Sequence, residues 1–110
     1  MSRDNSEIVV IVEPGACGFH ATIKARKSDG KNVTIEILES KCKQIQKLSQ
    51  NIEKISLKDL FMPITSNPVY VACKQAGCHA SCVIPVAVIK AAEAALGLAL
   101  SKDISIKFQS

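Results

Sequence analysis

The residues able to do chemistry are concentrated in one short stretch, Cys78-His79-Ala80-Ser81-Cys82. It holds two thiols and one imidazole, directly before an apolar segment with helical character. Thiolates and imidazoles are the ligands that zinc and iron–sulfur clusters take in proteins. We therefore interpret this stretch as one wall of a small metal or cluster site, to which other elements must bring further ligands.

A predicted β-hairpin carries two more cysteines to one place. Residues 8–12 are typical of a buried strand, and apolar and polar residues then alternate over 19–26 and 33–37 on either side of an Asp-Gly turn. Inward-facing isoleucines can oppose one another across this hairpin only if the loop has an odd length. In that register Cys17 and Cys42 arrive at the same end of the hairpin, about one residue out of alignment.

Helix signals follow the hairpin. Helix starts are expected at Ser40, at the capping pair Ser56 and Asp59, at Asn67-Pro68 and at Pro85, with stops at Gly77 and Gly97. Cys42 would then lie in the first turn of one helix and Cys82 just before another, where the positive end of the helix dipole favours a thiolate. Cys73 shares an apolar face with its helical neighbours, so we interpret it as a core residue.

The order of these elements predicts the fold class. Ile104, Ile106 and Phe108 alternate with polar residues and predict a closing strand. We therefore expect an α+β, two-layer fold: a three-stranded antiparallel meander, then helices, then a closing C-terminal strand, with the helices on one face of the sheet. The chain of 110 residues is expected to form a single domain over residues 8–110, preceded by a flexible N-terminal tail of residues 1–7.

Composition narrows the range of partners. The formal net charge is +4, the basic residues are scattered, and the chain has no Trp and one Tyr, so the features of a nucleic-acid binder are missing. No stretch is long and apolar enough for a signal peptide or a membrane span, so we expect a cytoplasmic protein without a membrane partner. In that reducing setting, the five cysteines are metal ligands or redox groups more often than structural disulfides.

Together these elements predict a site with at least three soft ligands. Its predicted cysteines are Cys17, Cys42 and Cys82, and His79 or Cys78 is available as a fourth ligand. Either an iron–sulfur cluster or zinc would suit this set. A cluster shared between two subunits needs only two or three ligands from each chain, so a homodimer is compatible with the pattern.

Three motifs occur in an order known from one protein family: Pro14-Gly15-Ala16-Cys17-Gly18, then Cys42 after a hairpin, then His79 with a late cysteine before an Ala-rich helix. Over residues 8–96 the chain thereby resembles the iron–sulfur cluster assembly scaffold proteins of the NifU N-terminal type. The resemblance implies a small α+β domain that holds a nascent [2Fe–2S] cluster or a zinc ion on three cysteines, with protein partners in cluster assembly. Phe19 stands where that family has an aspartate, and both Cys78 and Cys82 can match its last cysteine. The whole chain is also similar to a small group of uncharacterised prokaryotic proteins that share Cys-Gly-Phe, Ser-x-Cys and His-x-x-Cys elements.

Three functions therefore compete. The first is a metal or iron–sulfur cluster binding protein that serves as a cluster scaffold or carrier. The second is a cysteine-based redox or thiol enzyme, with a helix-start thiolate at Cys42 or Cys82 and His79 as the neighbouring base. The third is an interaction module with structural cysteines. The clustering of soft ligands favours the first, and hence a protein that is not an enzyme.

Overall fold

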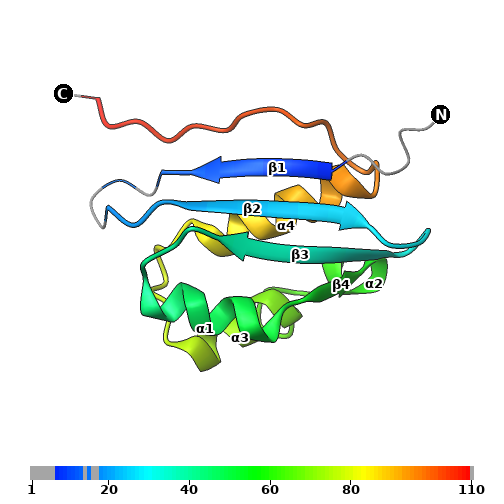
Figure 1. Cartoon of the computed structure of the whole chain (residues 1–110), viewed down its shortest axis with the longest axis horizontal. Helices are drawn as coiled ribbons and strands as arrows, with labels where there is room; N and C mark the ends of the chain where they lie inside the picture. Colours follow the sequence, from blue (N-terminus) through cyan, green and yellow to red (C-terminus); the bar gives the residue numbers. More distant parts are fainter. Residues whose placement is uncertain (1–6, 14, 16–17, 110) are drawn as a thin grey trace.

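The computed structural model describes residues 7–13, 15 and 18–109, and an antiparallel sheet is at its centre (Figure 1). The strands are β1 (Glu7–Val12), β2 (Ala21–Lys27), β3 (Asn32–Leu38) and β4 (Lys54–Ser56), in the spatial order β1-β2-β3-β4. The predicted meander is confirmed, and β4 is added to it as a short fourth strand. Of the predicted N-terminal tail, residues 1–6 lie outside the described residues, and Glu7 already belongs to β1.

The hairpin of β2 and β3 has the register that its isoleucines require. Ile23 opposes Ile37, and the last residue pair joins Lys27 to Val33, so the loop has the predicted odd length. The carboxylate of Asp29 stabilises the turn by accepting a hydrogen bond from the backbone N–H of Lys31 at 2.7 Å. This register places the inward-facing side chains of both strands on the same face of the sheet.

Helices cover that face. They are α1 (Lys43–Asn51), α2 (Leu57–Leu60), α3 (Pro68–Ala76) and α4 (Ile84–Ala95). The long helix α4 crosses behind β1 and β2, while α1 and α3 pack against each other (Figure 1). Sheet and helices share one core, in which the largest fully buried side chains are Ile23, Leu48, Ile55, Ile84, Val33, Val69 and Val88. The predicted α+β class, with helices on one face of the sheet, is confirmed.

Three predicted helix boundaries are confirmed in atomic detail. Ser56 and Asp59 form a reciprocal capping box at the start of α2, with hydrogen bonds of 3.1 and 3.0 Å. Asn67 begins α3, because its side-chain oxygen accepts a hydrogen bond from the N–H of Val69 at 3.0 Å. Gly77 ends the same helix with a φ of 79°, a left-handed conformation that favours glycine.

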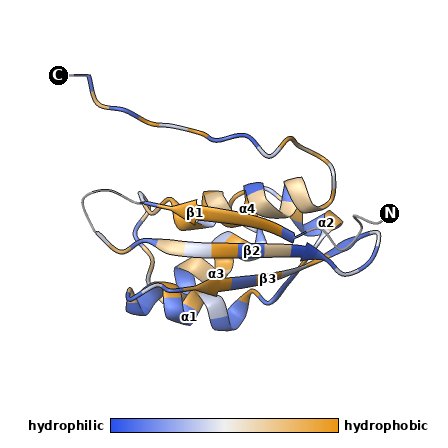
Figure 2. Cartoon of the chain, turned by 45° about the horizontal axis from the view of Figure 1, so that its top comes forward, coloured by the Kyte–Doolittle hydropathy of each residue, from blue (hydrophilic) through white to orange (hydrophobic). Residues whose placement is uncertain are grey.

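The predicted closing strand is wrong. Residues 98–109 form neither helix nor strand, and the side chains of Ile106 and Phe108 are 83% and 101% exposed. Alternation gives a segment the propensity for a strand, but a strand forms only where a partner offers hydrogen bonds and packing. After Gly97 the segment instead leaves the body of the protein (Figure 2).

Among the described residues, no helix is both long and apolar enough to cross a membrane.

Candidate functional site

A cavity of about 510 Å³ opens between the start of α1 and the loop that joins α3 to α4. Three cysteines line it, Cys42, Cys78 and Cys82, together with His79. The other lining residues are Phe19, Gln44, Ile45, Ser81, Val83 and Ile84. Soft ligands from two segments far apart in the sequence are therefore gathered around one cavity.

Cys42 occupies the cap position of α1. The predicted helix start at Ser40 is therefore wrong by two residues: the hydroxyl of Ser40 accepts the backbone N–H of Cys42 at 3.2 Å instead of capping the helix. The Cys42 side chain makes no capping bond, and its thiol donates a hydrogen bond to the side-chain oxygen of Gln44 at 3.2 Å. The thiol proton of Cys42 is therefore already engaged in a hydrogen bond within the first turn of α1.

Cys78 and Cys73 are brought together by the end of α3. The left-handed Gly77 reverses the chain, so that the backbone N–H of Cys78 donates to the carbonyl of Cys73 at 3.0 Å. This is the 6→1 hydrogen bond of a Schellman motif. The two side chains then meet on the same side of the turn, where the Cys73 thiol is hydrogen-bonded to the Cys78 sulfur. Cys73 is only 6% exposed and is not among the residues that line the cavity.

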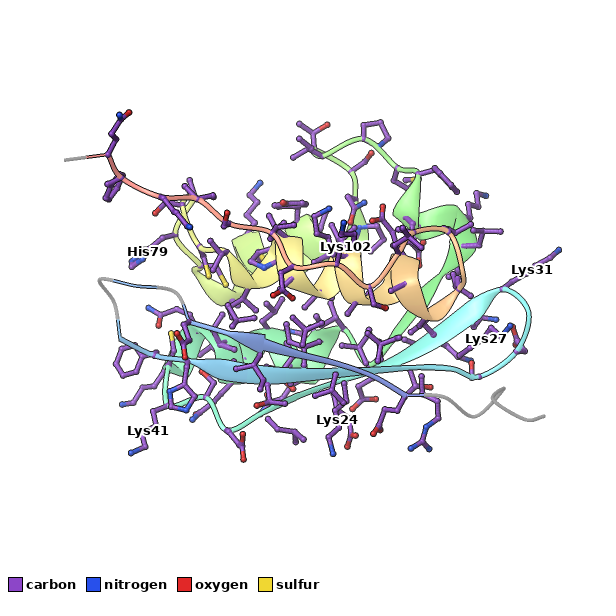
Figure 3. The ribbon with its side chains drawn as sticks, turned by 90° about the horizontal axis from the view of Figure 1, so that it is seen from above. Lys24, Lys27, Lys31, Lys41, His79 and Lys102 are labelled. Atoms are coloured by element: carbon purple, nitrogen blue, oxygen red, sulfur yellow. The ribbon has the colours of Figure 1, made fainter. Side chains whose placement is uncertain are left out.

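The loop before α4 presents Cys82 and His79. A turn joins them, because the backbone N–H of Cys82 donates to the carbonyl of His79 at 3.0 Å. Val83 is the cap residue of α4, so Cys82 lies immediately before the cap, as expected from the sequence. His79 is exposed and its side chain points outward from the loop (Figure 3).

The thiols lie close enough to influence one another's ionisation. Burial raises the pKa of Cys78; the hydrogen bond from Cys73 opposes this rise, and negative charge on Cys82 and Cys42 adds to it. Burial also raises the pKa of Cys73 well above its ordinary 9.0, and charge on Cys78 contributes to the rise. At neutral pH both groups therefore remain protonated, with the Cys73 S–H as donor and the Cys78 sulfur as acceptor.

The predicted ligands meet different outcomes. Cys42, Cys78, Cys82 and His79 line the same cavity. Cys17 lies outside the described residues, and its role stays a prediction. Over residues 7–13, 15 and 18–109, no three side chains of His, Cys, Asp or Glu are positioned to hold a metal ion as they stand. A metal would therefore have to draw the sulfurs closer together.

Sequence reasoning missed the contribution of Cys73. Its apolar neighbours indicated a core position, which is correct, since Val69, Ala72, Cys73 and Ala76 are all buried. The signal for its second property was the spacing to Cys78 across Gly77. A Schellman motif commonly brings these two positions into side-chain contact.

The chain matches the model of a family of unknown function (DUF6951) over residues 8–108. No curated protein and no solved structure matches it. The family match covers both segments that line the cavity and continues through most of the exposed C-terminal segment.

Proposed function

Because the chain belongs to the DUF6951 family of unknown function, we propose its function from its own residues: it binds zinc or an iron–sulfur cluster through Cys42, Cys78 and Cys82. The observation that carries this proposal is that these three cysteines and His79 all line one cavity. Sulfur and imidazole ligands suit zinc and iron–sulfur clusters, whereas magnesium and calcium prefer oxygen.

The electrostatics of the cavity support a cationic ligand. Negative charges on Cys82 and Cys42 raise the pKa of Cys78, so adjacent thiolates repel one another when nothing neutralises them. A bound cation replaces that repulsion with attraction and releases the thiol protons. The hydrogen bond from the Cys73 thiol already favours the ionised form of Cys78. We therefore assign Cys73 the role of supporting Cys78 through this hydrogen bond rather than that of a ligand.

The surrounding structure allows the sulfurs to approach. Cys78 and Cys82 lie in the segment between α3 and α4, where side chains can rotate without breaking a helix or a strand. The thiol of Cys42 has to leave Gln44, which costs one hydrogen bond of about 1 kcal/mol. Structural zinc sites yield about 10 kcal/mol or more on binding, far more than this rearrangement requires.

Metal analysis tests the proposal directly. The full chain, purified without oxygen, would be assayed for zinc, iron and sulfide, and its visible absorption would be recorded. We expect stoichiometric zinc, or iron with sulfide and a broad visible band, which is lost in Cys42→Ser, Cys78→Ser and Cys82→Ser. Ser81→Ala is the matched control, because Ser81 lines the same cavity without offering a soft ligand. Metal content that is unaffected by all three cysteine substitutions would contradict the proposed site.

Two further variants define the ligand set. Cys17→Ser tests the ligand role predicted for Cys17 from the sequence, and His79→Ala separates an imidazole ligand from a solvent-exposed histidine. If the bound species is a cluster, its transfer to a metal-free acceptor protein tests the scaffold or carrier role. Retention of the cluster under these conditions would assign it to the protein as a resident cofactor.

The hydrogen-bonded pair of Cys73 and Cys78 favours a second candidate function, in thiol–disulfide exchange. In that reaction the S–S bond of a small-molecule disulfide breaks and a Cys73–Cys78 disulfide forms, while the two cysteine protons pass to the two small-molecule thiols that are released. Peptide mapping by mass spectrometry after treatment of the metal-free protein with oxidised glutathione would detect this disulfide. A reversible Cys73–Cys78 link in protein that takes up no metal would favour this function over the first.

A further inference from the structure

The C-terminal segment Ser101–Gln109, called the arm below, carries large apolar side chains that the described structure leaves exposed. Every residue of the arm is exposed, and it carries Ile104, Ile106 and Phe108 on alternate positions. Figure 2 shows the arm extending away from the sheet and helices. Three large apolar side chains in strand alternation are a costly feature on a soluble protein unless another surface covers them.

The sheet has a complementary edge. β1 is at the end of the strand order, so one side of its backbone pairs with β2 and the other is open. Exposed edge strands usually carry a proline, a bulge or an inward-pointing charge that prevents further pairing. β1 has none of these between Ile8 and Val12: the residues are all apolar and the register with β2 is continuous.

The core is also incompletely covered at this edge. Ile8 and Val10 face the core from β1 but are only half-buried, and Ile89 of α4 and Leu96, which follows that helix, are half-buried against the same core. A strand added next to β1, with its apolar side chains facing inward, would pack against these residues. The nine residues of the arm span about 30 Å when extended, which exceeds the roughly 20 Å of the six-residue β1.

The direction of the arm and its charged residues favour antiparallel pairing with β1 of another copy over parallel pairing with β1 of its own chain. In Figure 1 the arm runs in the same direction as β1 of its own chain, so pairing within one chain would be parallel, whereas every strand pair in this sheet is antiparallel. An antiparallel register that places Lys107 opposite Glu7 also places Ile106 opposite Ile8 and Ile104 opposite Val10. Lys102 then lies opposite Val12, the last residue of β1. A parallel register that puts the same isoleucines opposite β1 places Asp103 opposite Glu7, which is repulsive.

We propose that the arm of one copy pairs as an antiparallel strand with β1 of a second copy, and that the reciprocal pairing makes a two-fold symmetric dimer. Under a two-fold axis, each arm pairs with the open β1 edge of the other copy, and the two contacts are identical. Arms exchanged in this way convert the four-stranded sheet of each copy into a five-stranded one. The dimer depends on the arm alone and not on any metal, so it is independent of the function proposed above.

Molar mass in solution, measured by light scattering, tests the proposal. The full chain is measured with reductant and chelator present, beside a chain that ends at Ala99 and the variants Ile106→Lys and Ser105→Lys. We expect a dimer for the full chain and for Ser105→Lys, whose substituted side chain would point to solvent. The truncated chain should be a monomer, and Ile106→Lys should raise the dissociation constant at least about tenfold. The arm buries no side chain in the described structure, so both changes leave the core intact.

Amide hydrogen exchange of β1 provides the second measurement. In the dimer, the β1 amides that face the open edge should be protected, and they should exchange rapidly in the truncated chain. A monomeric full chain would overturn the proposal, and protected β1 amides in that monomer would show that the arm pairs within its own chain. A dimer that survives truncation, or one that Ile106→Lys and Ser105→Lys affect equally, would overturn it as well.

Discussion

Replacing Cys73 by alanine should make Cys78 less reactive, although Cys73 itself is almost inaccessible. The Cys73 thiol donates a hydrogen bond to the Cys78 sulfur and thereby counteracts the effect of burial on the pKa of Cys78. Cys73→Ala removes that donor while the Cys78 sulfur stays half-buried. The pKa of Cys78 should therefore rise further, and the thiolate, which is the reactive form, should become rarer at any given pH below that pKa.

The size of the effect follows from the bond that is lost. A net hydrogen bond contributes about 1 kcal/mol, and about 1.4 kcal/mol corresponds to a tenfold change in an equilibrium. The thiolate population of Cys78, and with it the rate of alkylation, should fall about fivefold in Cys73→Ala. Cys73→Ser is the matched control, because its hydroxyl can still donate to Cys78, so its rate should remain near that of the unchanged protein.

The assay is the pH dependence of iodoacetamide alkylation in metal-free protein. Trypsin cleavage after Lys74 and Lys90 gives a peptide that contains both Cys78 and Cys82, and fragmentation in the mass spectrometer distinguishes the two sites. The Cys78 profile should move to higher pH in Cys73→Ala. An unchanged profile, or one that moves to lower pH, would refute the proposed action of Cys73 on Cys78.

Three other predictions concern stability. Burial raises the pKa of Cys73 above its ordinary 9.0, so the unfolded chain loses this proton first. The free energy of unfolding should therefore fall above about pH 9 by up to about 1.4 kcal/mol per pH unit, and less steeply in Cys73→Ala. Urea titrations across alkaline pH in the presence of reductant measure this dependence. Asn67→Ala should lower the free energy of unfolding by about 3 kcal/mol in the same assay. The buried Asn67 side chain caps α3 and donates to the carbonyls of Asp59 and Met62 at 3.0 and 3.3 Å. A loss below about 1 kcal/mol would be inconsistent with this hydrogen-bond network. Zinc at a hundred times its dissociation constant should raise the free energy of unfolding by about 2.7 kcal/mol, whereas Cys42→Ser should show no gain at the same concentration.

Local rules were sufficient for most of the fold. The parity of the isoleucine positions gave the hairpin register, because a shift by one residue would turn Ile23 and its buried neighbours toward solvent. The caps at Ser56 and Asn67 depend on contacts within three residues, which a sequence displays directly. The short strand β4 has only three residues and pairs with β3, from which α1 separates it in the sequence. No local pattern therefore indicated it.

The wrong prediction for the C-terminal segment has a different origin. Ile104, Ile106 and Phe108 do have the alternation of a strand, so the local sequence favours an extended conformation. Whether a segment pairs depends on the edge available to it, and that is a property of the assembled sheet or of a second chain. The arm therefore combines correct local chemistry with a partner that the sequence of one chain does not specify.

The candidate site was also predictable only in part. Cys42 and Cys82 lie near predicted helix starts, which favour thiolates and which the sequence displays. The remaining two thiols lie at the opposite kind of helix terminus, since Cys73 is in the last turn of α3 and Cys78 follows its Gly77 cap. The negative end of a helix dipole disfavours a thiolate, which acts in the same direction as burial. Burial and the helix end thus both favour protonated thiols at Cys73 and Cys78, so a cation would have to displace the Cys78 proton to complete the proposed site.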